Sequence, residues 1–205
     1  MATGADATQA PGGGLEAVVL AAGSGIRFGG GKLLAPYGEG VLLDAALGAA
    51  FAAPARSVTV VTGADAQRVA AAARAFNPAV CIVHAADHGE GMGASLRAGV
   101  ASLPADTDGV FVFLGDMPRV PVAVLPRLAS AIAQGARAAA PMFDGRRGNP
   151  VLLGRAVFPD LLRLTGDEGA RSVLQRLGEL LALIEAPDDG VLFDVDEVRD
   201  LTPRP

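Results

Sequence analysis

The sequence is short of the residues from which proteins most often build disulfide frameworks and transition-metal sites. Its 205 residues include a single cysteine, no tryptophan and two histidines. One cysteine excludes an internal disulfide framework and a cysteine-rich zinc site, and two histidines are too few for a histidine-based metal cage. So little cysteine fits a reducing compartment, and we expect a cytoplasmic protein.

Long apolar runs and an excess of basic residues are also missing. Apolar stretches are broken by charged or turn residues well short of the ~20 residues that cross a bilayer, so no membrane is expected as a partner. The first 14 residues have neither the basic start nor the apolar core of a secretory signal, and we expect a disordered tail at 1–14 and one domain at 15–205. The 17 basic residues stand against 22 acidic ones, a net charge of −5, which disfavours nucleic acid as the main partner.

Short apolar strands and helix-like stretches alternate along the chain. Strand-like runs occur at 16–21, 57–62, 79–84 and 109–114, and helix-like stretches at 41–53, 65–76 and 93–103. This alternation is typical of βαβ units, so the fold class we expect is α/β, with three layers and a doubly wound, mainly parallel sheet. After residue 116 we expect helices near 121–134, 155–164 and 168–180, and strands at 181–186 and 191–195 that close the sheet. Cys81, inside an apolar strand, is expected to be buried.

A glycine-rich segment directly follows the first strand. It reads Leu20-Ala21-Ala22-Gly23-Ser24-Gly25-Ile26-Arg27-Phe28-Gly29-Gly30-Gly31-Lys32. Glycines let the main chain turn sharply and present N–H groups to an anion, while Arg27 and Lys32 add positive charge. A P-loop would need glycine at position 26 and Ser or Thr at 33, and a dinucleotide fingerprint would need glycine at 28. The segment therefore predicts phosphate binding of another type, and a glycine-rich surface turn is the alternative.

A second apolar strand ends in a carboxylate, in the segment Gly115-Asp116-Met117-Pro118. If this strand runs parallel to the first, Asp116 and the glycine-rich segment meet at the carboxyl edge of the sheet, where open α/β folds bind ligands. A carboxylate beside a polyphosphate usually holds magnesium, so we predict Asp116 as a metal ligand and magnesium as the cofactor. A turn or helix cap is the alternative role for this residue.

These segments resemble a known family. Leu20 to Lys32 is similar to the Leu-Ala-Ala-Gly-x-Ser/Gly-x-Arg-x-Gly-x-x-Lys signature of the sugar-nucleotide-like nucleotidyltransferases, and Gly115 to Pro118 resembles their metal-binding aspartate motif. Stretches at 91–99, 145–151, 166–171 and 194–201 resemble one MobA-like branch, the molybdenum cofactor cytidylyltransferases and their relatives. The matched segments occur in the same order as in the family, and together they extend from about residue 15 to about residue 201.

The resemblance implies a role for each matched residue. The base and phosphates of the nucleotide would be bound by Leu20, Ala21, Ala22, Gly23, Ser24, Gly25, Arg27, Lys32 and Ser95. Asp116 and Asp196 would hold magnesium, and Arg27, Lys32 and Asp116 form the implied catalytic set. Candidate acceptor-binding residues are Arg146, Arg147, Asn149 and Arg171, with a solvated surface position as the alternative for each arginine. Glu197 and Val198 depart from the family's Thr-Pro, and Asn149 stands where the branch often has histidine.

The implied activity is magnesium-dependent transfer of CMP from CTP to the phosphate of molybdopterin or molybdenum cofactor, with release of pyrophosphate. Ala22 stands where guanylyl-transferring relatives carry glycine, which assigns CTP as the nucleotide. CTP and the cofactor are then the substrates, and a molybdoenzyme that receives the product is a further partner. Two alternatives remain open. One is a guanylyltransferase or another NTP transferase with a different phosphorylated acceptor; the other is a non-catalytic carrier or insertion protein for molybdenum cofactor.

Overall fold

The computed structural model describes residues 14–25, 28–167 and 169–202. Apart from Gly14, the tail expected at 1–14 lies outside the described residues, and so does Arg27 of the implied catalytic set. Within the described part of the chain, no helix is long and apolar enough to cross a membrane.

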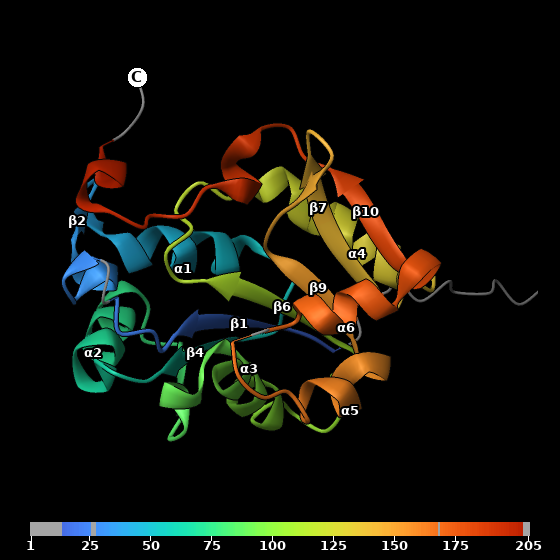
Figure 1. Ribbon diagram of the computed structural model, residues 1–205, viewed down its shortest axis with the longest axis horizontal. Helices are drawn as coiled ribbons and strands as arrows, with labels where there is room; N and C mark the ends of the chain where they lie inside the picture. Colours follow the sequence, from blue (N-terminus) through green and yellow to red (C-terminus); the bar gives the residue numbers. More distant parts are fainter. Residues whose placement is uncertain (1–13, 26–27, 168, 203–205) are drawn as a thin grey trace, which may run out of the picture.

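In the described part of the chain, the main sheet has eight strands. Seven of them follow the spatial order β10-β7-β9-β6-β1-β4-β5, and β8 pairs with β7 (Figure 1). The strands are β1 (Leu15–Ala21), β4 (Val58–Thr62), β5 (Cys81–His84), β6 (Gly109–Leu114), β7 (Ala138–Phe143), β8 (Arg146–Arg147), β9 (Val151–Gly154) and β10 (Leu181–Glu185). Along this order every pairing is parallel except those of β9, which runs antiparallel to β6 and β7. A separate antiparallel pair joins β2 (Pro36–Tyr37) and β3 (Gly40–Val41). The predicted mainly parallel α/β sheet is confirmed.

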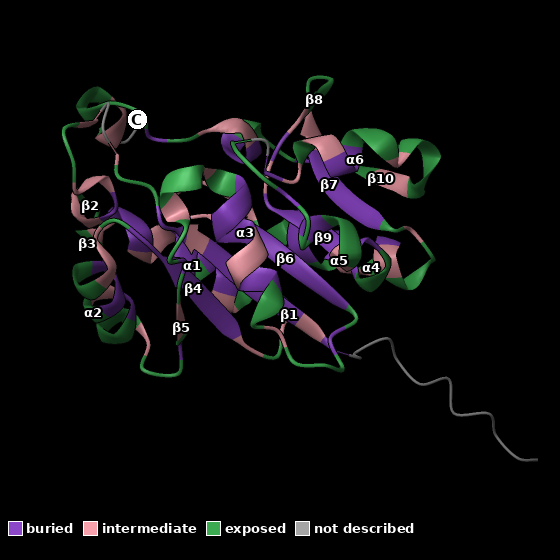
Figure 2. Ribbon diagram, turned by 60° about the horizontal axis from the view of Figure 1, so that its bottom comes forward, coloured by how far each residue is buried: buried purple, intermediate pink, exposed green. Residues whose placement is uncertain are grey.

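Helices cover both faces of the sheet because successive strand residues point to opposite sides. Ala17, Val19 and Ala21 pack toward α1 (Leu42–Ala52), α2 (Ala66–Phe76) and α4 (Leu125–Ala133). Val18 packs toward the other three helices, α3 (Met92–Ala101), α5 (Phe158–Leu161) and α6 (Arg171–Arg176). The central strands are buried between these two layers (Figure 2). The three expected layers are therefore present.

The edge of the sheet at the start of β1 is closed by a network of charged side chains. Glu16 is 2% exposed, and its carboxylate accepts hydrogen bonds from Arg56 Nε at 2.8 Å and Ser57 Oγ at 2.7 Å. The same guanidinium donates to both carboxylate oxygens of Asp106, at 2.8 and 3.0 Å, and these bonds lower the pKa of Asp106. This network is satisfied internally, which leaves the opposite, carboxyl edge for ligands.

Three sequence expectations differ from the structure. Residues 191–195 form no strand; a 3-10 helix spans Asp189–Leu192, and the chain then runs over the loops at the carboxyl edge. It is held there by isolated backbone bonds, from Asn149 N to Val191 O at 2.8 Å and from Val195 N to Asp116 O at 3.0 Å. Cys81 is exposed rather than buried, because β5 is the edge strand of the sheet. The last two expected helices are also shorter, at α5 and α6.

Candidate active site

Lys32 and Asp116 meet at the carboxyl edge of the sheet although 84 residues separate them in the sequence. Lys32 Nζ lies 2.6 Å from Asp116 Oδ2, and the two side chains are 14% and 24% exposed. The pairing of β1 with β6 brings them together, and Gly115 N continues it by donating to Leu20 O at 3.0 Å. A Cβ at Gly115 would lie 3.1 Å from that same carbonyl oxygen, so the close approach of the two strand ends favours glycine here.

Two further carboxylates belong to this cluster. Asp196 Oδ1 lies 4.0 Å from Lys32 Nζ. Burial raises the pKa of Asp194, and the negative charges of Asp196 and Asp116 raise it further. The sequence motif contained Asp194, but only its partial burial beside two carboxylates shows that it belongs to the site. One ammonium group thus faces three carboxylates.

The chemistry of this cluster fits a hard divalent cation, because carboxylate oxygens are the protein ligands that magnesium and manganese prefer. Within the described residues, no group of three or more His, Cys, Asp or Glu side chains is arranged to hold a metal ion by itself. Magnesium is usually held by one or two carboxylates together with phosphate oxygens of the substrate, so a site completed by a nucleotide agrees with both observations.

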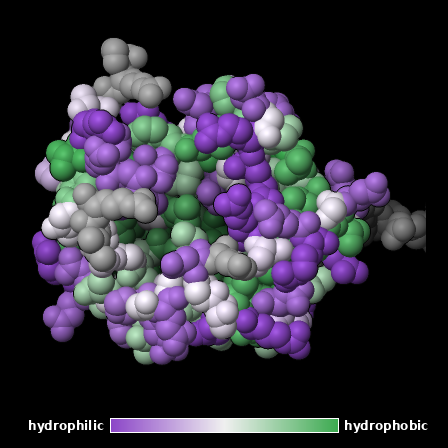
Figure 3. All heavy atoms as spheres, in the orientation of Figure 1, coloured by the Kyte–Doolittle hydropathy of each residue, from purple (hydrophilic) through white to green (hydrophobic). Residues whose placement is uncertain are grey.

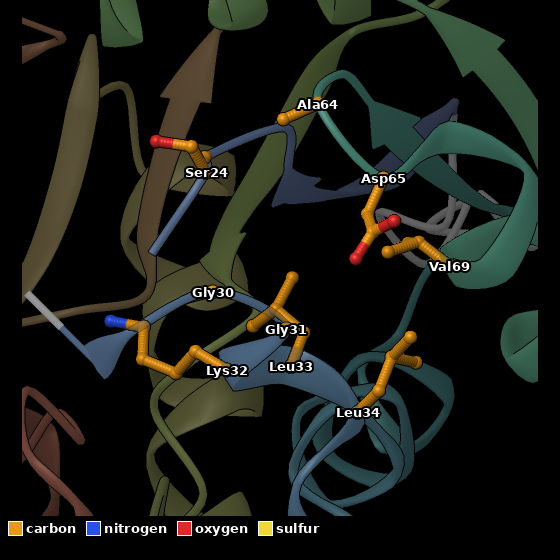
Figure 4. Close-up of a pocket in the computed structure, with 10 residues that line it drawn as sticks. Ser24, Gly30, Gly31, Lys32, Leu33, Leu34, Ala64, Asp65 and Val69 are labelled. Carbon is orange, nitrogen blue, oxygen red and sulfur yellow. The ribbon is translucent and has the colours of Figure 1, made fainter. Parts of the chain in front are cut away.

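A small cavity of about 220 Å³ lies beside the glycine-rich segment. Its lining includes Gly23, Ser24, Gly30, Gly31 and Lys32 from that segment, and Ala64 and Asp65 from the turn after β4. Figure 4 shows the Asp65 carboxylate pointing toward the cavity, while the Lys32 side chain extends away from it. Sequence analysis overlooked Asp65 as a site residue. The signal in the sequence was its position three residues after the end of β4, a strand parallel to β1, which places it at the same edge of the sheet.

A larger cavity of about 780 Å³ opens on the other side of the first strand end. Its volume lies in the range of small-molecule sites. Apolar side chains from β1, β6, β9, α3 and α6 line it, among them Leu20, Leu114 and Leu174. In the orientation of Figure 1, the surface of the molecule shows a hollow with apolar atoms at its floor and hydrophilic atoms on its rim (Figure 3).

All four predicted acceptor residues, Arg146, Arg147, Asn149 and Arg171, line this larger cavity. Burial lowers the pKa of Arg147, and the positive charge of Arg171 lowers it further, so the two guanidinium groups lie near one another. Neither forms an ion pair with a carboxylate in the described residues. Two neighbouring cations at a mixed polar and apolar cavity suit an organic molecule that carries an anionic group.

Two other predicted nucleotide residues, Ala22 and Ser95, are buried. Ala22 is 4% exposed, and a Cβ at Gly63 would lie 2.7 Å from its methyl group, so this methyl is buried against the turn after β4. Ala64 N donates to Ala22 O at 3.2 Å and ties the two turns together. Ser95 is 5% exposed in α3, three residues after Met92 of the larger cavity. Ser95 lines neither of the two cavities, and the nucleotide-binding roles of Ala22 and Ser95 stay predictions.

Two curated relatives extend over nearly the whole chain. The chain is 33% identical over 192 residues to nicotine blue oxidoreductase of Paenarthrobacter nicotinovorans. This alignment covers 90% of this chain and 93% of the relative. It is 24% identical over 187 residues to the molybdenum cofactor cytidylyltransferase of Escherichia coli K12. This alignment covers 91% of this chain and 93% of the relative. The cytidylyltransferase is thus a distant relative.

Solved structures agree with the fold. The homologue of Mycobacterium tuberculosis Rv0371c from Mycobacterium sp. strain JC1 superimposes with a TM-score of 0.81 at 30% identity and covers 91% of this chain and 92% of that one. A complex of Rv0371c itself with manganese, from Mycobacterium tuberculosis H37Rv, gives a TM-score of 0.70 at 28% identity. The superposition covers 84% of this chain and 88% of that one. A relative of this chain has therefore been crystallised with a divalent metal.

One family model spans most of the chain and includes both strand ends of the site. The model of the MobA-like NTP transferase domain matches residues 17–180, from β1 through the glycine-rich segment and Asp116 to the residue before β10. This chain belongs to the family of MobA-like NTP transferases.

Proposed function

We propose that this protein transfers CMP from CTP to a phosphate group of a molybdopterin-type cofactor, with magnesium as the metal and pyrophosphate as the second product. The observation that carries the proposal is the meeting of Lys32 with Asp116, Asp194 and Asp196 at the carboxyl edge of the sheet. This cluster lies at the end of a glycine-rich segment suited to phosphates. One ammonium group against three carboxylates leaves an excess of negative charge, which a divalent cation would balance. A protein that only carries a cofactor has no need of such an arrangement.

The residues of the chain divide the work between the two cavities. Gly23, Ser24 and Gly31 offer backbone N–H groups to the phosphates of the nucleotide, whereas the N–H of Gly30 donates to Gly25 O at 3.0 Å and shapes the turn. Lys32 offsets the negative charge that grows on the departing pyrophosphate, and Arg27, by its place in the motif, acts with it. Magnesium bound by Asp116 and Asp196 would neutralise charge on the reacting phosphate.

The larger cavity holds the acceptor in this proposal. Arg147 and Arg171 bind its phosphate, with Arg146 and Asn149 on the same rim, and the apolar wall receives the body of the molecule. A terminal oxygen of that phosphate then attacks the α-phosphate of CTP in line, and the bond from the α-phosphate to the β-phosphate breaks. No protein nucleophile is required, because the main contribution of the enzyme is to align two anions.

The choice of CTP is supported by the name of the Escherichia coli relative and by Ala22. The Ala22 methyl is buried against Gly63, so it would not touch the base directly. Instead, the methyl group would influence the choice of base by fixing the position of the glycine-rich segment around the base. Such a steric effect is worth ~1–3 kcal/mol, so hydrogen bonds to the base must supply the remaining discrimination.

The experiment that tests the proposal measures pyrophosphate release with each of the four nucleoside triphosphates at equal concentration, with magnesium and purified cofactor. We expect turnover to be highest with CTP. Equal or faster turnover with GTP would refute the Ala22 argument and leave nucleotidyl transfer intact. Cofactor binding without pyrophosphate release from any nucleotide would instead support the carrier alternative.

The acceptor site is tested separately by Arg171→Ala. Loss of one guanidinium at the larger cavity should raise the KM for the acceptor about tenfold or more and leave the KM for CTP nearly unchanged, because a hydrogen bond to a charged group is worth ~1.5–3 kcal/mol. Arg176→Ala is the matched control, since Arg176 is exposed at the end of the same helix and does not line the cavity. A rise in the KM for CTP alone would contradict the assignment.

A further inference from the structure

Arg97 joins two segments that approach the larger cavity from different parts of the sequence. We call residues 87–93 the nucleotide loop, and residues 164–167 with 169–171 the acceptor segment. From α3, Arg97 Nη1 donates to Leu164 O of the acceptor segment at 2.6 Å. Arg97 Nη2 lies 3.4 Å from Asp87 Oδ2 and 3.3 Å from Glu90 Oε2 of the nucleotide loop. One partly buried guanidinium thus links both segments.

The two segments also touch directly, because glycines remove the side chains that would separate them. Gly93 N donates to Gly166 O at 2.9 Å, and a Cβ at position 93 would approach that oxygen to 2.8 Å. A Cβ at Gly169 would lie 2.9 Å from Met92 Sδ. The hydrogen bond between Gly93 and Gly166 ties the two segments together, so a displacement of one segment would strain this bond unless the other follows.

Both segments end in residues that line the larger cavity. The nucleotide loop leads into α3 with Met92 and Leu96, and the acceptor segment contributes Asp167, Ala170 and Arg171. Arg97 itself is not part of the lining, and its guanidinium contacts no cavity residue through a hydrogen bond or ion pair in the described part of the chain. Its contribution to the site therefore passes through the segments that it holds.

We propose that Arg97 is a positioning residue that couples nucleotide binding to the placement of Arg171 in the acceptor site. A nucleotide that orders the nucleotide loop would, through Arg97 and the glycine contacts, also order the acceptor segment. By linkage, an acceptor that orders its segment strengthens nucleotide binding by the same factor. This inference rests on the proposed function, since it takes the nucleotide to be bound by the glycine-rich segment. The nucleotide loop borders that segment, because a Cβ at Gly63 would lie 2.7 Å from both the Ala22 methyl group and His88 Cγ.

The test is hydrogen exchange of the acceptor segment with and without CTP and magnesium, in the full-length protein. In the wild type, CTP should slow exchange in residues 164–171 about tenfold, within the range typical of coupling between sites. In Arg97→Ala the affinity for CTP, measured by calorimetry, should stay within about threefold, while the protection of the acceptor segment is lost. Arg97→Lys should give an intermediate effect, because one ammonium cannot reach Leu164 O and both carboxylates together.

Arg163→Ala is the matched control, since this neighbouring arginine is 80% exposed and faces only Asp160, at 4.0 Å. It should behave as the wild type. If CTP binds to the wild type without protecting the acceptor segment, or protects it fully in both Arg97 variants, the inference is overturned and the proposed function stands. If neither CTP nor GTP binds, the proposed function is overturned and the inference with it. Should Arg97→Ala fail to fold, Arg97→Lys decides.

Discussion

Replacing Asp116 with asparagine removes one negative charge from the carboxylate cluster and keeps the size of the side chain. Lys32 loses its charged partner at 2.6 Å and retains Asp196 at 4.0 Å. The proposed metal loses a ligand, and loss of one group that stabilises charge in a transition state typically slows a reaction by ~10²-fold or more. We therefore expect the turnover rate to fall by ~10²-fold or more, which corresponds to a loss of at least about 2.7 kcal/mol of transition-state stabilisation.

The fold should be affected much less. The hydrogen bond between Lys32 and Asp116 involves two charges, and such bonds contribute ~1.5–3 kcal/mol. Two effects offset its loss, because the asparagine retains an acceptor oxygen and because the repulsion of Asp194 by a neighbouring carboxylate is relieved. A net loss of about 1 kcal/mol corresponds to a decrease of ~2–4 °C in Tm for a domain of this size.

The assay is the rate of pyrophosphate release with CTP, acceptor and magnesium, together with thermal unfolding followed by circular dichroism. Asp106→Asn is the matched control, since Asp106 also pairs with a basic side chain, Arg56, but at the opposite edge of the sheet. The control should keep full turnover. Turnover of Asp116→Asn within a few-fold of the wild type at ordinary magnesium concentration would refute the metal-binding role of Asp116. A large decrease in Tm would assign the lost activity to the fold.

Three further predictions concern neighbouring and remote charges. Lys32→Ala should raise the KM for CTP and slow turnover together, because a cation on the leaving phosphates binds more tightly as charge develops; steady-state kinetics in which only the acceptor KM changes would contradict this role. Asp194→Asn should raise the Tm of the metal-free protein at neutral pH, because a raised pKa means that the ionised carboxylate costs stability in the folded state. The gain should shrink as the pH falls through the raised pKa of Asp194 in the folded protein, and it should disappear below the ordinary pKa of 3.8, where the group is neutral in both the folded and the unfolded state. A gain that persists in acid would have another cause. Glu16→Ala should lower the free energy of unfolding by about 3 kcal/mol, because it removes a buried carboxylate that accepts hydrogen bonds from Arg56 and Ser57. That corresponds to a Tm lower by ~6–12 °C, and calorimetry showing an unchanged Tm would remove the structural role of Glu16.

Local sequence patterns determined the individual elements of the first half of the chain. The apolar runs at 16–21 and 109–114 are β1 and β6, and the stretches at 41–53 and 65–76 are α1 and α2, each within one or two residues of its bounds. The signals are contained within each element, because apolar spacing and flanking glycines act on neighbouring residues. Parallel pairing then follows from the alternation of strands and helices, so the sequence also placed the glycine-rich segment and Asp116 at one edge.

Only the tertiary structure decided how the segments after residue 140 join that edge. The apolar residues at 191–195 satisfy a strand pattern, yet Gly190 packs against the backbone of Arg119 and Gly148 against that of Val191, and these contacts hold the segment over the loops. Cys81 lies in an apolar strand but is exposed, because the order of strands makes β5 an edge. The partial burial of Asp194 and the link from Arg97 to Leu164 likewise join residues distant in the sequence. No local sequence pattern encodes such contacts, because the backbone groups and charged side chains that make them come together only after the sheet has formed.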